Sequence, residues 1–470
     1  MTPALFPDLG VVLAGLAAAT VAGGLLIRPF TATLTRRERL AWGLATGLLL
    51  QAGCLLLLLG VGARPDAWKM LALEAFIAVI AALAARSRGV AAARVSATRA
   101  AHMGDRRALV VLLSCVAGAA WLVFFVGSLA DSMWATDFLA FWGYKGRIVF
   151  LTGEIPQRLF HDPALYFAHP EYPLLVPLTL AALASFVGRW NDQALALLYP
   201  ICALATLAAI SGFLARRVSR VAGAAAAALS SLCFFLYRPA NAGTAEIPLA
   251  LGLVLATSAA IDFLQQDDAS GAAKLAIASL FCASVKQEGA LFVLLLAAVL
   301  WWRPRRAGKR PAGWLAAAAL ALPVAAHAIL MRLLRGSEHP RDFDFSLLEP
   351  ARWPELASRY GLVVRHIVGG EARQALVPIL AIVLFFLATR RGIGDPLIPT
   401  FAGQFVVYTM AFTVSAFGPS FAIDTALGRL TMSLFPAFTL VLGARLPTAF
   451  MASAAGSRTP HRPASGTAGN

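Results

Sequence analysis

The chain alternates between long apolar blocks and short, polar, mostly basic stretches. The blocks run for about 17–25 residues, the length that a helix needs to cross the hydrocarbon of a bilayer. Open strands cannot cross lipid, because their backbone groups would stay unpaired, and the strict alternation of an outer-membrane barrel is absent. We therefore predict an all-α, polytopic transmembrane bundle of about thirteen spans. The predicted spans are residues 9–27, 40–62, 66–86, 108–130, 193–214, 221–237, 245–262, 272–285, 287–302, 313–334, 374–389, 396–417 and 428–446.

One further apolar block, residues 173–188, is short and contains Pro177. Its role follows from the basic turns, which the positive-inside rule places in the cytoplasm. Counting 173–188 as a span would put the turn at Arg216–Arg220 outside, so we interpret it as a helix lying in or dipping into the outer interface. The alternative is that one basic turn breaks the rule. This topology puts the N-terminus outside and the C-terminus inside.

Composition agrees with a membrane protein and excludes a nucleic-acid partner. Of 470 residues, 59% are hydrophobic and 14% are charged, against roughly 25% charged residues in soluble domains. The formal net charge of +16 comes from the turns, where it acts as a topology signal. We divide the chain into N-terminal transmembrane helices (1–107), a transmembrane core (108–446) and a disordered cytoplasmic tail rich in Ser, Ala, Gly and Pro (447–470).

Two predicted outer loops are long, Asp131–Asp192 and Arg335–Arg373. Loops beyond about 12–15 residues are usually functional or disordered, and the Trp, Tyr and Pro content of these two favours order. The topology gathers acidic residues on the outer face, so we expect any chemistry there. They are Asp131, Asp137, Glu154, Asp162, Glu171, Asp192, Glu246, Glu288 and Asp424.

Asp137 follows the outer end of a span and precedes residues 138–151, in which aromatic and aliphatic residues recur at helical spacing around Lys145. Such a segment suits a helix in the membrane interface. A carboxylate near lipid is a candidate general base. The alternative for Asp137 is a helix N-cap.

Two more acidic residues stand in proline-shaped contexts. Glu171 lies in His169-Pro170-Glu171-Tyr172-Pro173, where it could hold a substrate hydroxyl or a cation, or be a solvated loop residue. Glu246 opens a span ahead of Pro248. An acid followed by proline in the first helical turn satisfies the helix dipole without any further role.

Two cationic residues are candidates for binding an anion. Lys286, with Glu288, interrupts the apolar stretch Leu275–Trp302, and charges at such depth are costly and usually functional. Lys286 could meet a phosphate, or form an internal Lys–Glu pair. Arg429 begins the last span. It could clamp a lipid phosphate through its fork of donors, or snorkel as an interface anchor.

The order of these segments resembles the polytopic GT-C glycosyltransferases, which include the bacterial lipid A aminoarabinose transferases and the protein O-mannosyltransferases. The resemblance covers residues 110–446, and it departs from the family in Glu246, where Asp is common, and in extra helices over 9–86. The segments that carry it are Asp137…Trp142…Lys145, Gly153-Glu154-Ile155-Pro156, His169-Pro170-Glu171-Tyr172-Pro173, Ala245-Glu246-Ile247-Pro248, Lys286-Gln287-Glu288-Gly289 and Asp424…Arg429…Pro436.

The resemblance implies a transferase on the outer face of the bacterial inner membrane. It would move a sugar from a polyprenyl-phosphate donor to an envelope glycan, lipid or protein, with Asp137 as the base and Lys286 and Arg429 at the donor phosphate. The implied binding residues are Lys145, Glu171, Tyr172, Glu246, Lys286, Glu288 and Arg429.

No resident cofactor is expected, a divalent cation is left open, and no convincing Gly-rich nucleotide loop is present. The alternatives are a transporter or flippase, which usually shows inverted repeats and broken helices, and a protein that only scaffolds an envelope complex.

Overall fold

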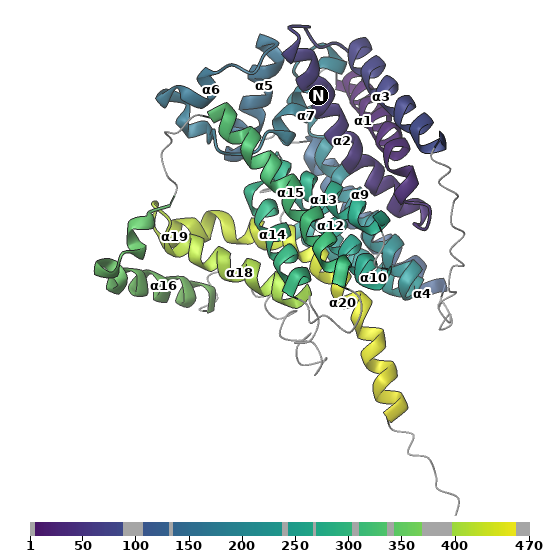
Figure 1. The fold of residues 1–470 in the computed structure, drawn as a ribbon, viewed down its shortest axis with the longest axis vertical. Coiled ribbons are helices and arrows are strands. Elements are labelled where there is room, and N and C mark those ends of the chain that lie inside the picture. Colours follow the sequence, from purple (N-terminus) through teal and green to yellow (C-terminus); the bar gives the residue numbers. More distant parts are fainter. Residues whose placement is uncertain are drawn as a thin grey trace, which may run out of the picture.

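A computed structural model describes residues 5–87, 107–130, 135–236, 243–266, 269–302, 310–335, 343–368 and 397–456. Within these ranges the chain is a bundle of helices (Figure 1), with a single isolated bridge between Phe343 and Ser415. Eight helical segments of the described chain are long and apolar enough to cross a membrane. They correspond to all or most of α1 (Leu5–Ile27), α2 (Arg36–Gly60), α3 (Ala67–Ser87), α4 (Arg107–Ala130), α9 (Leu198–Arg217), α12 (Glu246–Gln266), α15 (Arg310–Arg335) and α20 (Gly428–Gly456).

The remaining helices are shorter. Five of them are apolar: α7 (Leu175–Val187), α10 (Arg220–Leu236), α13 (Ala269–Val285), α14 (Gln287–Trp302) and α18 (Leu397–Thr413). The others connect the bundle helices: η1 (Arg28–Phe30), η2 (Phe138–Trp142), α5 (Gly143–Thr152), α6 (Arg158–His161), η3 (Pro163–Ala168), α8 (Asp192–Leu195), η4 (Phe345–Leu348), η5 (Pro350–Arg352), α16 (Trp353–Val368), α19 (Pro419–Ala422) and η7 (Ile423–Leu427).

The prediction of an all-helical bundle is confirmed for the described residues. Every predicted span except 374–389, which lies outside those residues, coincides with a helix to within a few positions, apart from the C-terminal end of α20. The number of helices that cross a bilayer stays a prediction, because α10, α13, α14 and α18 are only 16–17 residues long.

The segment 173–188 does form a helix, α7, and nearly all its residues are buried against α1, α2 and α5. This enclosure fits a dipping helix, since only protein can shelter a short helix at membrane depth. Helix α20 continues to Gly456, into the predicted tail, and the disorder of that tail stays a prediction. Residues 447–456 contain Ala and Met, which favour helix.

Helices α1 and α2 pack so closely that their backbones are in contact. A Cβ atom at Gly47 would collide with the backbone of Ala19, and one at Gly23 would collide with the backbones of Gly43 and Gly47. Small residues spaced four apart are the usual means of close helix packing in membranes, where water supplies no hydrophobic drive. The sequence Gly43-xxx-Gly47 thus fixes the N-terminal pair of helices.

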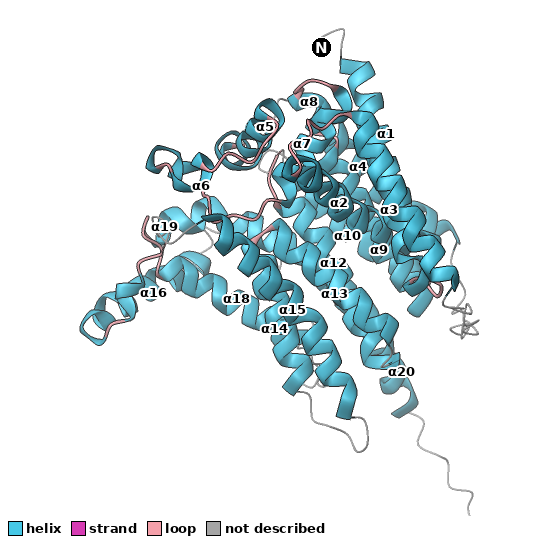
Figure 2. Cartoon of the chain, turned by 45° about the horizontal axis from the view of Figure 1, so that its top comes forward, coloured by secondary structure: helices cyan, strands magenta, loops and turns pink. Residues whose placement is uncertain are grey.

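Helix α12 is almost wholly buried and packs against α9, α13 and α20. We call the end of the bundle at Glu246, the first residue of α12, the site end, and the end at Asp262 the opposite end. Helices α13 and α12 are antiparallel, since Lys286 contacts Glu246 and Lys274 contacts Asp262. In Figure 2 the connecting helices α5, α6, α16 and α19 all lie on the left of the molecule.

Candidate functional site

A chain of ion pairs joins four regions of sequence at the site end. Arg429 Nη1 donates to Asp137 Oδ2 and lies 3.9 Å from Glu246 Oε1. Lys286 Nζ lies 2.8 Å from the same Glu246 oxygen and 3.1 Å from Glu288 Oε1. We call Asp137, Glu246, Lys286, Glu288 and Arg429 the site cluster. The structure thus brings together the acids and bases that the sequence singled out, while their role toward a substrate stays a prediction.

The break between α13 and α14 places Lys286. Its backbone N–H donates to the carbonyl of Cys282, and its own carbonyl accepts from the N–H groups of Gly289 and Ala290. The backbone hydrogen bonds are therefore kept where α13 gives way to α14. A Cβ atom at Gly289 would collide with the carbonyl oxygen of Cys282. Glycine is therefore what allows α14 to start this close to the end of α13, with Lys286 facing α12.

Asp137 and Arg429 each adjoin a π-helical turn. Asp137 directly precedes η2, and Arg429 is the second residue after η7. Such turns are rare and often occur at functional sites, because the extra residue redirects neighbouring side chains. Phe138 fills the space next to Gly243, whose φ of 93° is left-handed and whose added Cβ would lie 2.6 Å from Phe138 Cβ.

The centre of the site cluster is buried, whereas the side chains of Asp137, Arg429 and Glu288 are 17%, 19% and 25% exposed, and the cluster is richer in acids than in bases. Glu246 has no exposed surface, and Lys286 is 6% exposed. Three carboxylates face two cations, and the Oε2 atom of Glu246 has no hydrogen-bond partner. A buried acceptor without a donor costs about 1–3 kcal/mol. The cluster therefore offers a vacant acceptor to a hydroxyl or amine group.

A second group of side chains, which we call the aromatic cluster, adjoins the first. It consists of Trp142, Lys145, His169, Glu171 and Tyr172. Lys145 is 1% exposed, and its Nζ donates to the carbonyl of His169 at 2.5 Å. The ring of Tyr172 stacks on Trp142 and on His169, with ring centroids 5.3 Å and 4.6 Å apart.

Glu171 ties the two clusters together. Its carboxylate lies 2.6 Å from His169 Nδ1, and its carbonyl accepts from Gln287, the neighbour of Lys286, at 3.1 Å. Burial by itself would raise the pKa of Glu171, but the hydrogen bond with His169 and the nearby Lys145 hold that pKa below its usual value. Glu171 is therefore a carboxylate at neutral pH and is not a freely solvated loop residue.

The contacts distinguish between several alternatives. Asp137 makes no capping hydrogen bond and uses its carboxylate on Arg429. Arg429 is mostly buried and ion-paired, unlike a snorkelling anchor. Lys286 does form the internal Lys–Glu pair that was the structural alternative, with both Glu246 and Glu288.

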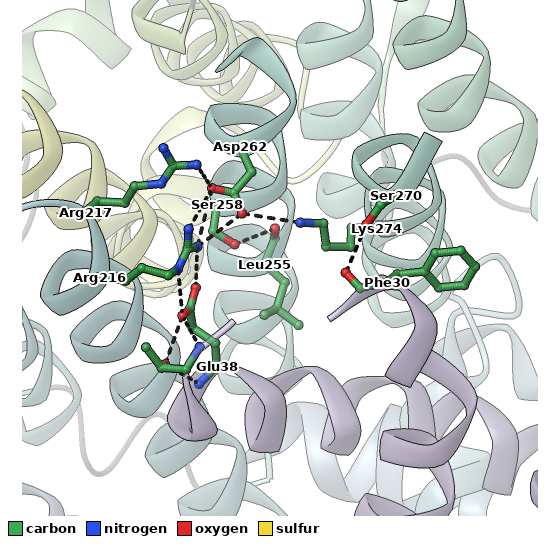
Figure 3. A network of polar contacts seen from close by, with 10 residues as sticks. Phe30, Glu38, Arg216, Arg217, Leu255, Ser258, Asp262, Ser270 and Lys274 are labelled. Atoms are coloured by element: carbon green, nitrogen blue, oxygen red, sulfur yellow. Dashed lines mark hydrogen bonds and ion pairs between the residues drawn. The ribbon is translucent and has the colours of Figure 1, made fainter. Parts of the chain in front are cut away.

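The sequence reasoning missed a buried ionic network at the opposite end (Figure 3). Arg216 contacts Glu38 at 2.7 Å and Asp262 at 3.1 Å, Arg217 also donates to Asp262, and Lys274 lies 3.3 Å from it. The only local signal was the capping box of Thr35 and Glu38 at the start of α2. The other members of the network lie on α9, α12 and α13, and the spacing of residues in the sequence does not reveal that they meet Glu38.

The predicted loop Arg335–Arg373, to which we assigned no chemistry, contributes α16. His366 Nε2 lies 2.8 Å from Asp424 Oδ1 in η7, and Arg359 donates to the carbonyl of Ser415. Helix α16 is therefore attached to the segment that leads into Arg429.

No protein-family model matches the chain, and neither the curated proteins nor the solved structures contain a significant match. Within the described residues, no group of three or more His, Cys, Asp or Glu side chains is placed to hold a metal ion.

Proposed function

We propose that the protein is a membrane glycosyltransferase that moves a sugar from a polyprenyl-phosphate donor to a hydroxyl-bearing acceptor of the cell envelope. The main support for this proposal is the site cluster, in which Asp137, Glu246, Lys286 and Arg429 meet at one end of an apolar bundle. A lipid-linked donor keeps its phosphate at headgroup depth, so charges at the end of a bundle can meet it without crossing hydrocarbon.

The Arg429–Asp137 pair supports an exchange of partners. Without a ligand, Arg429 neutralises Asp137. An incoming phosphate offers Arg429 a bidentate partner, which would release the Asp137 carboxylate to accept a proton. The base then becomes available only when the donor is bound.

In the transfer step, the acceptor oxygen attacks the anomeric carbon and gives its proton to Asp137. The bond between the sugar and the lipid phosphate breaks, and the phosphate keeps the electron pair. Arg429 and Lys286 stabilise the charge that develops on that phosphate. Glu246, with its unpartnered Oε2, is placed to accept from a hydroxyl of the sugar or acceptor.

The aromatic cluster has a positioning role in this proposal. Lys145 is committed to the carbonyl of His169, so it holds the 169–172 segment in place. Tyr172, fixed by Trp142 and His169, and the Glu171 carboxylate then border the site cluster through Gln287.

The test is sugar transfer by purified protein in nanodiscs supplied with polyprenyl-phosphate-linked sugars and an envelope extract as acceptor. Asp137→Asn should lower the rate by about 10²–10⁴-fold, the usual contribution of a general base. Asp162→Asn is the matched control, because asparagine can still cap η3 as Asp162 does. Transfer by Asp137→Asn at the control rate would refute the assignment of the base.

A transporter or flippase is the second candidate. It is favoured by the presence of buried ionic clusters at both ends of α12, which could act as alternating gates. The same nanodisc preparation separates the candidates, because a transferase yields a covalently altered acceptor by mass spectrometry. A flippase would move labelled lipid across liposomes and leave every acceptor mass unchanged.

The proposed location is the inner membrane of a bacterium, with the site end outward. Glu154→Cys and Arg220→Cys, one at each end of the bundle, test this with a membrane-impermeant maleimide on intact cells. Only the first should be labelled if the site end faces outward. Labelling of Arg220→Cys alone would reverse the orientation.

A further inference from the structure

Glu74 of α3 is a buried acid outside the site cluster and the opposite-end network. It is 2% exposed and lies about 11 Å, at a rise of about 1.5 Å per residue, from the start of α3. Within the described part of the chain, the hydrogen bond that its side chain accepts comes from Gln51 of α2, whose Nε2 lies 3.4 Å from Glu74 Oε1. Gln51 is itself fully buried.

Among the buried acids of the described residues, Glu74 differs in its charge environment. Asp8 pairs with Arg189, Glu38 with Arg216, Asp262 with Arg216, Arg217 and Lys274, and Glu246 with Lys286. No described cation pairs with Glu74. An isolated carboxylate inside a membrane-spanning bundle is expensive, and such a group usually neutralises itself instead.

Two buried oxygen atoms without hydrogen-bond partners indicate where the neutralising proton would sit. Glu74 Oε2 and Gln51 Oε1 are both buried, and both lack a hydrogen-bond donor. Two acceptors cannot satisfy each other, and each costs about 1–3 kcal/mol when left alone. A single proton on Oε2 supplies the missing donor for Gln51 Oε1, while Gln51 Nε2 continues to donate to Glu74 Oε1.

We propose that Glu74 is a membrane-embedded proton-binding site, protonated on Oε2 and held in a reciprocal acid–amide pair with Gln51. The surroundings agree, because α3 packs against α1, α2 and α7. On α1 the only charged side chain is Asp8, which Arg189 neutralises, and α7 has no titratable residue. On α2 the nearby titratable group is the thiol of the buried Cys54, and Lys69 on α3 is paired with Asp66.

Infrared spectroscopy of the protein in nanodiscs at pH 7 tests this directly. The difference between wild type and Glu74→Gln should contain the carbonyl band of a protonated carboxylic acid, which shifts in D₂O. The difference for Glu154→Gln, a change at an exposed acid, should contain no such band. Absence of the acid band from the Glu74→Gln difference would mean that Glu74 is ionised and would overturn the proposal.

A second variant decides the matter if Glu74→Gln does not fold. Gln51→Leu removes the partner and leaves the acid, so the acid band should persist and move to higher frequency. An unshifted band would contradict the acid–amide pair. Neither measurement depends on sugar transfer, so the outcome is independent of the proposed function.

Discussion

Glu246 and Asp262 stand at the two ends of α12, and each is the buried acid at which an ionic cluster converges. About 24 Å of helix separates them. The two clusters share this one helix but no ion pair, so their contributions to stability and activity can be separated by substitution.

At the site end, Lys286→Met should destabilise the protein by about 3–5 kcal/mol, because it leaves Glu246 buried without its nearest cation. The double variant Lys286→Met/Glu246→Leu should recover most of this loss, since apolar pairs commonly replace buried ion pairs without cost. Unfolding in mixed detergent micelles measures both.

Sugar transfer should remain undetectable in the double variant although its stability returns. Recovery of activity together with stability would show that the Lys286–Glu246 pair is structural only.

At the opposite end, Asp262→Asn should destabilise by about 3 kcal/mol, because Arg216, Arg217 and Lys274 would lose their shared carboxylate. Transfer per folded molecule should stay near the wild-type rate. Ser258→Ala, which removes only a hydroxyl bonded to the carbonyl of Leu255, is the control for a mild change on the same helix. A transfer rate that falls with intact folding would show that the two ends are coupled.

Gly243→Ala should lower transfer by about 10²-fold, since misplacement of reacting groups by about 1 Å has that effect. The new methyl group would press on Phe138 and displace Asp137, and the left-handed φ of Gly243 adds backbone strain. Gly53→Ala is the control, because its Cβ would meet nothing within 4 Å. Equal rates for the two variants would show that Phe138 does not position Asp137.

The acid stability of the protein should depend on Glu171. Its pKa is lowered in the folded state, so its contribution is complete above the unfolded-state pKa and is lost as the pH falls through the folded-state value. Glu171→Gln should therefore flatten the decline of the unfolding midpoint below about pH 4.3, the ordinary glutamate value. A variant that declines as steeply as the wild type would exclude Glu171 as the cause.

Helix α16 should lie on the membrane surface. Trp353, Ala357, Tyr360 and Val364 are exposed and recur at intervals of four and three residues, so they share one face. A spin label at Tyr360→Cys should collide more with oxygen than with a water-soluble nickel complex, and a label at Ser358→Cys should show the reverse. Both labels are introduced into a variant from which the native cysteines have been removed, because those would also react. Equal accessibility at the two positions would place α16 away from lipid.

The sequence could predict those features that depend on local periodicity. The long helices follow from the length of the apolar blocks, and the break at Lys286 follows from the charges that interrupt one of them. The pairs Asp137–Arg429 and Arg216–Glu38 could not be deduced, because their partners lie far apart in the chain. Glu74 escaped notice since one acid in an apolar block looks like any other until its lack of a cation is visible. The enclosure of α7 depends on tertiary packing that periodicity does not encode.

The short helices around Lys286 have a consequence for the surrounding bilayer. Helices α13, α14 and α18 have 16–17 residues and rise only about 25 Å, against a hydrocarbon thickness of about 30 Å. If they cross, thinning of the lipid beside them would relieve the mismatch of about 5 Å. Headgroups on this flank would then sit about 2–3 Å deeper in each leaflet than elsewhere, and a lipid phosphate would approach Lys286 and Arg429 without leaving its leaflet.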